Sequence, residues 1–303
     1  MSVAELESRE ITLEAATGGL WSDAWYRLIR NPSAIFGAFL VLMFVIAAIF
    51  APVIAPYGPL DQNLSLLKEG GIPPGPSMHH LLGVDLLGRD VFTRILYGAR
   101  FSLLIGVVSV AIGLSVGLVL GSIAGYLGGV VDTVVMRCMD VMLAIPGLLF
   151  AIGIVAMLGP GLTQIMIAVG VVNIPIFARL LRGSILAQRE NDFVLAARSV
   201  GVRRRAILFS HILPNAISPV IVQGTLAMAT AIIDVAGLGF LGLGPQDPST
   251  PEWGTMLTDV NDYLQAAPFL AIVPGIAIIL SVLGFNLIGD GLREGLDPKL
   301  RGR

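Results

Sequence analysis

Very few side chains in this sequence have the types and spacing that catalysis requires. The two lysines, Lys68 and Lys299, both lie outside a G-K-[ST] context, so there is no P-loop lysine to hold nucleotide phosphates. The three histidines do not form an H-E-x-x-H zinc motif, and no G-x-S-x-G nucleophile elbow occurs. The single cysteine, Cys138, excludes an intrachain disulfide and a cysteine-rich metal site. The sequence therefore predicts a chain with no catalytic residue, cofactor or metal site of its own.

One stretch, residues 237–242, matches the G-x-G-x-x-G pattern of dinucleotide-binding loops. In such loops the glycines follow a β-strand and open a helix whose N-terminus receives the pyrophosphate. Here they follow a long apolar segment, and Gly244 and Pro245 stand where the receiving helix would continue. The match therefore does not indicate nucleotide binding.

The densest group of basic residues lies in the segment 182–214. Residues 191–201 have polar side chains at the start and a glycine at the end, which predicts a short helix. Residues 202–209 predict a second short helix, which carries the run of three arginines that begins at Arg203. Two small helices hinged at Gly201 are typical of a docking element for another protein. A solvated loop that merely carries positive charge is the alternative.

The two short helices predicted above belong to a chain that is very apolar as a whole. Of 303 residues, 55% are hydrophobic and 13% are charged, whereas roughly 25% are charged in an average soluble protein. A soluble chain of this size cannot cover its surface with so few polar groups. The formal net charge of -2 also lacks the basic excess of a nucleic-acid-binding protein. The composition therefore predicts a polytopic membrane protein that binds membrane lipid and no nucleic acid.

Long uncharged runs mark the membrane spans, because a bilayer core about 30 Å thick needs about 20 mostly apolar residues per helix. The turn sequence Gly-Pro-Gly at 159–161 separates two spans within the longest run. Strand-period alternation is absent from these runs, which disfavours a membrane barrel. We therefore predict an all-α polytopic membrane protein with six transmembrane helices. The predicted spans are residues 34–55, 101–131, 134–158, 162–181, 216–238 and 268–288.

Orientation follows from the lysines and arginines, which favour cytoplasmic loops. With the N-terminus inside, 15 basic residues fall on the cytoplasmic side and four outside, which predicts that both termini are cytoplasmic. The predicted organisation comprises a cytoplasmic N-terminal tail, a six-span domain and a cytoplasmic C-terminal tail, at residues 1–33, 34–290 and 291–303. The six-span domain contains an external segment, a cytoplasmic loop and an external loop, at residues 56–100, 182–214 and 239–267.

The predicted N-terminal tail carries four glutamates and one arginine in its first 14 residues. It is therefore not a secretory signal, and we expect it to remain in the mature protein. The end of the tail mixes aromatic and basic side chains, which is typical of an amphipathic helix lying in the membrane interface. An ordinary juxtamembrane belt is the alternative. The residues concerned are Trp21, Trp25, Tyr26, Arg27 and Arg30.

A stripe of glycines at every fourth position runs along the second predicted span. Such a stripe lets another helix approach closely, and that helix belongs either to the same chain or to a partner subunit. The five glycines are Gly113, Gly117, Gly121, Gly125 and Gly129.

Charged and polar side chains within the spans are candidates for function. Arg137 and Asp140 stand three residues apart, which predicts a local ion pair near the cytoplasmic end. Asp234 is expected near the outer boundary, where it has a structural role or lines a pathway. Asn173 is the second candidate for lining a pathway, because Asn173 and Pro175 could open the fourth helix; a simple kink at Pro175 is the alternative.

The spacing within the segment 182–214 resembles the EAA loop of ABC-importer permeases, whose pattern is E-A-A-x3-G-x9-I-x-L-P. Leu195 and His211 depart from this pattern, because they replace its glutamate and its isoleucine. The positions that match it are Ala196, Ala197, Gly201, Leu213 and Pro214.

Further stretches narrow the resemblance to one kind of permease. Together with the loop, they resemble the dipeptide/oligopeptide (and nickel) importer permeases, and specifically the C-type subunit of the paired B-type and C-type permeases. These stretches are residues 80–90, 240–244, 250–254 and 283–293.

This resemblance implies the fold and partners of a type I ABC importer permease in the cell's inner membrane. It implies a heterodimer with a B-type permease, over two ATPase subunits that bind ATP and Mg, and an extracytoplasmic substrate-binding protein. In the family the EAA loop forms a coupling helix that sits in a groove of the ATPase. By position, Ala196, Ala197, Gly201 and Arg203 belong to this coupling loop, and Leu213-Pro214 leads into the fifth span.

Two questions stay open at this point. A self-contained secondary transporter would also combine six spans with interrupted helices, although it would need coupling-ion ligands within the membrane, and this chain offers few. The cargo is also open, because relatives in the resembled family handle dipeptides, longer peptides, glutathione and nickel. A peptide is the favoured cargo.

Overall fold

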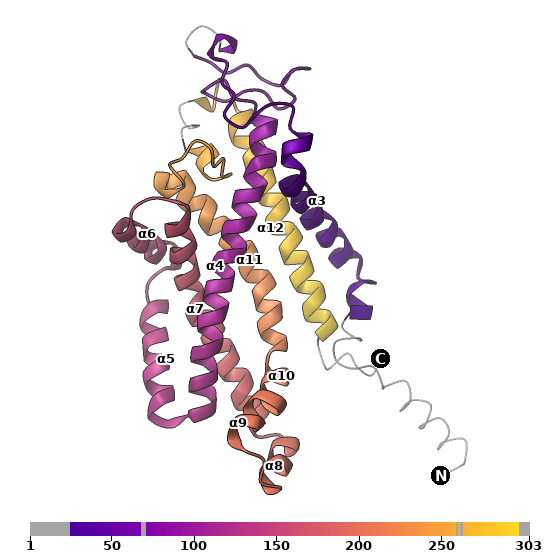
Figure 1. Cartoon of the computed structure of the whole chain (residues 1–303), viewed down its shortest axis with the longest axis vertical. Coiled ribbons are helices and arrows are strands. Elements are labelled where there is room, and N and C mark those ends of the chain that lie inside the picture. The colour runs from indigo at the N-terminus through magenta and orange to yellow at the C-terminus, as the bar shows by residue number, and fades with distance from the viewer. Residues whose placement is uncertain (1–24, 68–70, 259, 261–262, 297–303) are drawn as a thin grey trace, which may run out of the picture.

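The chain is helical throughout most of the part that the computed structural model describes, which comprises residues 25–67, 71–258, 260 and 263–296. Within that part, a lone antiparallel bridge joins Val84 to Asp90. The longest helices run along the long axis of the molecule (Figure 1). The main helices are α3 (Pro32–Ile54), α4 (Val91–Leu127), α5 (Gly129–Leu143), α6 (Gly147–Leu158), α7 (Leu162–Arg189), α11 (Ser218–Leu238) and α12 (Phe269–Leu296).

Five helices are long and apolar enough to cross a membrane, namely α3, α4, α7, α11 with its continuation to Leu243, and α12. The pair α5 and α6 passes the same test when the two are taken together, and the two helices meet at 90°. The predicted all-α membrane fold is confirmed, with the bent pair in the place of the third predicted span.

The bend between α5 and α6 differs from the single helix expected over 134–158. Helix α5 ends at Leu143, and α6 begins only at Gly147, directly after Pro146. Proline has no backbone N–H to donate, and its ring disfavours the helical conformation of the residue before it. The apolar composition therefore predicted the presence of the segment but not its break.

Helix α4 begins ten residues earlier than the predicted second span, which started at residue 101. Asp90 caps it by accepting a hydrogen bond of 2.7 Å from the Thr93 amide. Two arginines that the prediction kept outside the span are part of the helix. Arg94 donates to the Pro59 carbonyl at 3.4 Å, and Arg100 donates to the carbonyl of Ala48 in α3 at 3.2 Å. Because the chain itself supplies acceptors for both guanidinium groups, the helix can continue through them.

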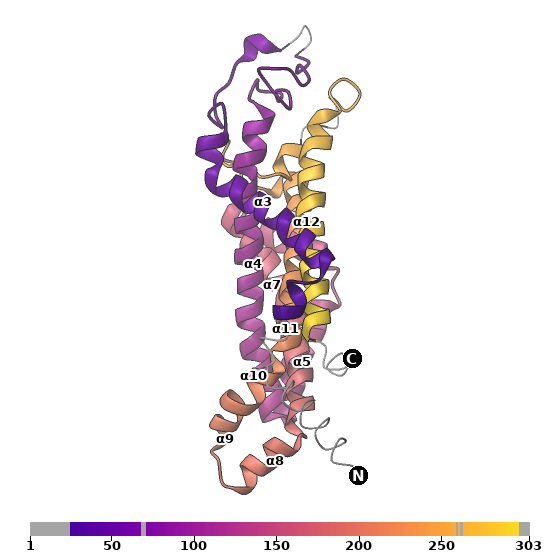
Figure 2. The ribbon, with the colours of Figure 1, turned by 90° about the vertical axis from the view of Figure 1, so that its right-hand side faces the viewer.

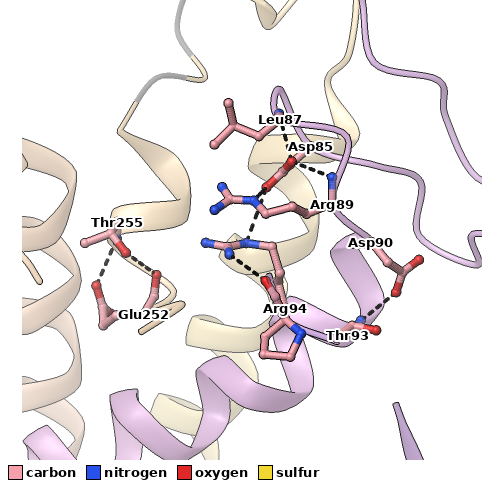
Figure 3. A network of polar contacts seen from close by, with 9 residues as sticks. Asp85, Leu87, Arg89, Asp90, Thr93, Arg94, Glu252 and Thr255 are labelled. Carbon is pink, nitrogen blue, oxygen red and sulfur yellow. Dashed lines mark hydrogen bonds and ion pairs between the residues drawn. The ribbon is translucent and has the colours of Figure 1, made fainter. Parts of the chain in front are cut away.

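The start of α4 is joined to the preceding segment by an ionic network around Asp85 (Figure 3). The Asp85 carboxylate accepts from the Leu87 and Arg89 amides, both at 2.9 Å, and from Arg89 Nε at 2.7 Å. Arg94 Nε lies 3.4 Å from the same carboxylate. Beside this network His80 contacts Asp90 at 3.0 Å. The segment before α4 is thus folded.

The glycine stripe of α4 packs against α7 of the same chain. A Cβ added at Gly117 would lie 2.6 Å from Phe177 Cβ, and one at Gly121 would lie 2.5 Å from the Ala178 carbonyl oxygen. Real Cβ atoms do not approach other atoms this closely, so the two helices meet backbone to backbone. Of the two predicted uses of the stripe, packing within the subunit is confirmed for its first four glycines, whereas Gly129 has open space around it.

Helix α3 packs along α12 at one side of the molecule (Figure 2). Close approach again depends on a glycine, since a Cβ at Gly37 would lie 2.7 Å from the Gly284 carbonyl oxygen. The opposite face of α3 exposes large apolar side chains, as expected of a helix in contact with lipid acyl chains. This face includes Ile35, Phe39, Leu42, Ile46, Phe50 and Val53.

The connection from α11 to α12 enters the helix bundle, although the whole of 239–267 was predicted as an external loop. Glu252 and Trp253 are fully buried. The Trp253 indole packs edge-on against Phe44 of α3, with 5.2 Å between ring centres, and donates to the Ile95 carbonyl at 3.2 Å. Glu252 accepts from the Ser102 hydroxyl of α4 at 3.2 Å. The middle of this loop therefore packs against α3 and α4, which its own sequence did not indicate.

The ends of the chain are described in part. Residues 25–28 are helical, and the Arg30 guanidinium lies 3.8 Å from the Tyr26 ring centre. Trp21 and the residues before Trp25 fall outside the described residues, so the prediction of an interfacial helix stays open. At the other end α12 continues to Leu296, which places the first residues of the predicted C-terminal tail in a helix.

Candidate functional site

The candidate docking element, around α8, lies at the opposite end of the molecule from the start of α4 (Figure 1). Helix α7 extends beyond its predicted end at 181 to Arg189, and the short helix α8 (Asp192–Ser199) follows. After a turn, α9 (Arg204–Ala206), a π-helical stretch (Ile207–Ile212) and α10 (Leu213–Ala216) lead to α11. The predicted segment 182–214 thus begins inside a helix, and its second helix is longer than expected.

Helix α8 has a buried and an exposed side. Val194 and Ala197 are buried and belong to one apolar cluster with Ile207, Leu208 and Ile212. Burial against the π-helical stretch fixes the orientation of α8.

A second, exposed side of this element, which we call its outer face, consists of Phe193 and Ala196 of α8 and of Val200, which caps the helix. All three are exposed, Phe193 by 40% and Val200 by 80%. They follow an i, i+3, i+7 spacing that puts them on one side of a helix. The two predicted alanines therefore point in different directions, because Ala197 packs inward while Ala196 lies on the outer face. Sequence reasoning missed Phe193 and Val200, whose helical spacing was the available signal.

Gly201 terminates α8 in a Schellman motif. Its backbone has a φ of +78°, in the left-handed region that glycine adopts without strain. The Gly201 amide donates to the Arg198 carbonyl at 3.0 Å, and the Val202 amide donates to the Ala197 carbonyl at 3.1 Å. This pair of bonds defines the motif. Open space surrounds the Gly201 Cα, so backbone conformation rather than crowding requires the glycine.

The π-helical stretch ends two residues before Pro214, and this proline accounts for the wider helical turn. Pro214 cannot donate a helical hydrogen bond, and its ring pushes away the carbonyl of the preceding turn. The Asn215 side chain instead donates to the His211 carbonyl at 2.8 Å. Leu213 is half-buried in the apolar cluster and Pro214 is exposed.

Hydrogen bonds tie this end segment to α4. The Tyr126 hydroxyl donates to the Arg204 carbonyl at 2.5 Å, and Arg189 donates to the Gly125 carbonyl at 3.0 Å. Because α7 and α11 enter and leave the segment directly, three spans are connected to α8. A force on α8 is therefore transmitted to α4, α7 and α11.

Ion pairs join α5 to α7 near the same end. Arg182 forms two bonds to Asp132, through Nε and through Nη2 at 2.6 Å. Arg179 contacts Asp140 at 2.7 Å. The predicted pair of Arg137 with Asp140 is present at 3.9 Å, but the shorter contact of Asp140 is with α7.

The pair of Asp132 with Arg182 is expected to couple α5 to α7 measurably. Both side chains are partly buried and the geometry is bidentate, so we expect a coupling energy of about 1 kcal/mol. A double-mutant cycle with Asp132→Asn and Arg182→Gln, read by thermal unfolding of the purified complex, measures it. Strictly additive effects of the two substitutions would contradict the expectation.

The two candidate pathway residues have different surroundings. Asn173 is buried, its amide donates to the Val169 carbonyl at 2.8 Å, and its Cβ packs against Gly113. Its predicted place on a pathway is therefore corrected to the packing between α4 and α7. Asp234 is half-exposed on α11. Its neighbour Ile232 packs in one cluster with Phe44 of α3, and the predicted place of Asp234 near the outer boundary stays a prediction.

Comparison with known protein families is consistent with this arrangement. Residues 19–74 match the N-terminal transmembrane domain of oligopeptide transport permease C. Residues 117–302, more than half of the chain, match the inner membrane component of binding-protein-dependent transport systems. The chain belongs to this family.

This permease is similar in sequence to its relatives over nearly its whole length. It is 47% identical over 281 residues to the dipeptide transport system permease protein DppC of Alkalihalophilus pseudofirmus, covering 93% of this chain and 90% of the relative. It is 48% identical over 282 residues to the glutathione transport system permease protein GsiD of Shigella flexneri, covering 93% and 91%.

Solved structures show the same fold. The MetNI methionine ABC transporter in an inward-facing conformation aligns with a TM-score of 0.57 at 17% identity, covering 67% of the permease and 96% of the matched chain. An amino acid ABC transporter aligns with a TM-score of 0.51 at 18% identity, covering 67% and 94%.

These similarities establish the general role of the permease. It is a multi-pass, non-catalytic component of an inner membrane ABC transport system. A binding-protein-dependent system also requires an ATPase and a binding protein as partners. The expectation that this chain binds no cofactor of its own stays a prediction.

Proposed function

We propose that this permease forms half of the translocation pathway of an ABC importer for di- or oligopeptides. The names of its relatives support the cargo, since they specify dipeptides, di- and tripeptides, or glutathione, all of them short peptides. The pathway would be completed by a B-type permease in a heterodimer. Two ATP-binding subunits would supply ATP and Mg, and an extracytoplasmic binding protein would deliver the cargo.

The observation that carries the proposal is the outer face of α8 together with its rigid mounting. An exposed apolar strip at the end of a membrane protein, flanked by arginines, is suited to a protein partner. Ala196 and Arg203 are exposed there and would contact the ATPase. Ala197, Leu213 and Pro214 would position the strip, and Gly201 would set the turn that follows it.

The orientation of the permease follows from the same proposal. Because ATP is available in the cytoplasm, the α8 end faces inward and the Asp85 network faces outward. This agrees with the concentration of arginines in 182–214, as the positive-inside rule requires.

Replacing Phe193 by aspartate should prevent stable binding of the ATPase subunits. A central aromatic side chain at an interface contributes about 2 kcal/mol or more, so we expect affinity to fall about thirtyfold or more. Co-purification of the ATPase with the membrane subunits, followed by titration, measures the change. Leu64→Asp is the matched control, because Leu64 is also exposed but lies at the opposite end. An unchanged ATPase affinity of Phe193→Asp would contradict the proposed docking.

The cargo is tested with the complete transporter in proteoliposomes. We expect ATP-dependent uptake of a radiolabelled dipeptide that requires both the binding protein and the ATPase, and no uptake of nickel. Uptake driven by an ion gradient without the ATPase would favour a secondary transporter instead. Uptake of nickel but not of peptide would overturn the peptide cargo.

A further inference from the structure

Asp234 differs from the acidic side chains of α5, because it lacks a basic partner. Asp132 and Asp140 each contact an arginine of α7. The Asp234 carboxylate makes no hydrogen bond and no ion pair with any residue in the part of the chain that the structure describes. A carboxylate within a membrane span is costly unless it meets a cation or water. The missing partner must therefore come from outside the residues that the structure describes.

The depth of Asp234 places it well within the membrane. Ile232, two residues earlier, shares an apolar cluster with Phe44 and Trp253. Phe44 lies about 18 Å along α3 from its start and about 15 Å from its end, at a rise of 1.5 Å per residue. A carboxylate at this level cannot reach the lipid headgroups on either side, so it must face protein or an aqueous pathway.

Asp234 belongs to a polar stripe on α11. Gln223, Thr230 and Asp234 are spaced by seven and eleven residues, which puts them within about 20° of one direction around a helix. Thr230 is exposed, and the other two are half-exposed. The stripe is therefore polar, and in this subunit it is exposed at Thr230.

We propose that the Asp234 carboxylate binds the cationic amino terminus of the peptide cargo as it crosses the membrane. This proposal rests on the proposed peptide import. A peptide with an unblocked amino terminus carries an ammonium group with three N–H donors, which complements a carboxylate that accepts hydrogen bonds. The ammonium group would supply the positive partner that the Asp234 carboxylate lacks. The Thr230 and Gln223 side chains continue the polar surface from Asp234 toward the α8 end.

The test uses the complete transporter in proteoliposomes with a radiolabelled dipeptide. We compare the wild type with Asp234→Asn, Asp234→Glu and Asp234→Lys, and with Asp290→Asn as a matched control on an exposed acid of α12. Initial uptake, ATP hydrolysis stimulated by the binding protein, and the thermal unfolding midpoint of the complex are measured for each.

We expect Asp234→Asn to reduce uptake at least tenfold, Asp234→Lys to reduce it further, and Asp234→Glu to retain uptake within threefold. ATP hydrolysis and the unfolding midpoint should stay close to those of the wild type. Uptake by Asp234→Asn within twofold of the wild type would overturn the proposal, as would equal losses in the glutamate and asparagine variants. Loss of uptake together with a lowered unfolding midpoint would instead assign Asp234 to an ion pair with the second permease. A wild-type complex that imports no peptide would refute the proposed function itself.

Discussion

Replacing Gly201 by valine should leave the transporter assembled but unable to convert ATP hydrolysis into uptake. Gly201 has a φ of +78°, and an ordinary residue in the left-handed region costs about 1–2 kcal/mol, with a β-branched residue at the upper end. The open space around Gly201 leaves the side chain itself without a clash. The strain is therefore expected to be relieved by rotation of the end of α8. We expect uptake to fall at least tenfold while ATP hydrolysis stays within twofold, both measured in proteoliposomes.

Gly201→Asn is the matched control for this substitution. Asparagine tolerates the left-handed region better than other non-glycine residues, so it should preserve the Schellman motif and most of the uptake. If the valine and asparagine substitutions reduce uptake equally, the left-handed conformation of the turn is not what coupling requires. Unchanged uptake by Gly201→Val would count decisively against a role for this turn in coupling.

Replacing Gly121 by leucine should prevent the permease from folding into a stable complex. A Cβ at this position would lie 2.5 Å from the Ala178 carbonyl oxygen, a backbone atom that cannot move without displacing α7. Overpacking of this kind costs about 1–3 kcal/mol or more, and here it acts on the interface that holds the longest helix of the bundle. We expect at least a tenfold lower yield of assembled complex, measured by size-exclusion chromatography after extraction.

The control for crowding is Gly275→Leu in α12. An added Cβ there would meet no atom within 4 Å, so the same change of residue should be tolerated at near wild-type yield. A normal yield of the Gly121→Leu complex would show that α4 and α7 can separate without loss of assembly.

The features that the sequence predicted well depend on residues that are close together in the chain. The helix that ends at Gly201 was predicted because polar residues start it and a glycine ends it within a few residues. The spans were located because a helix in lipid must be apolar along its length. Internal packing of the glycine stripe was one of two predicted uses, since spacing alone cannot say which helix fills a groove.

The features that the sequence did not predict depend on contacts between distant residues. Arg100 could join α4 only because a carbonyl of α3 accepts from it. Asn173 appeared available for a pathway until Gly113 was found against it. The bend before α6 is an exception, because Pro146 was a local signal that the apolar composition of the segment outweighed.

The length of α4 has a consequence for how the two ends of the permease communicate. Its 37 residues make a rod about 55 Å long, well beyond the roughly 30 Å of a bilayer core. One end is fixed in the Asp85 network and the other is bonded to the α8 segment through Tyr126. Within this rod there is neither a proline nor a break. In the proposed importer, docking of a loaded binding protein at the Asp85 end would therefore tilt this single stiff helix and so move the α8 end, without a relay of separate conformational steps.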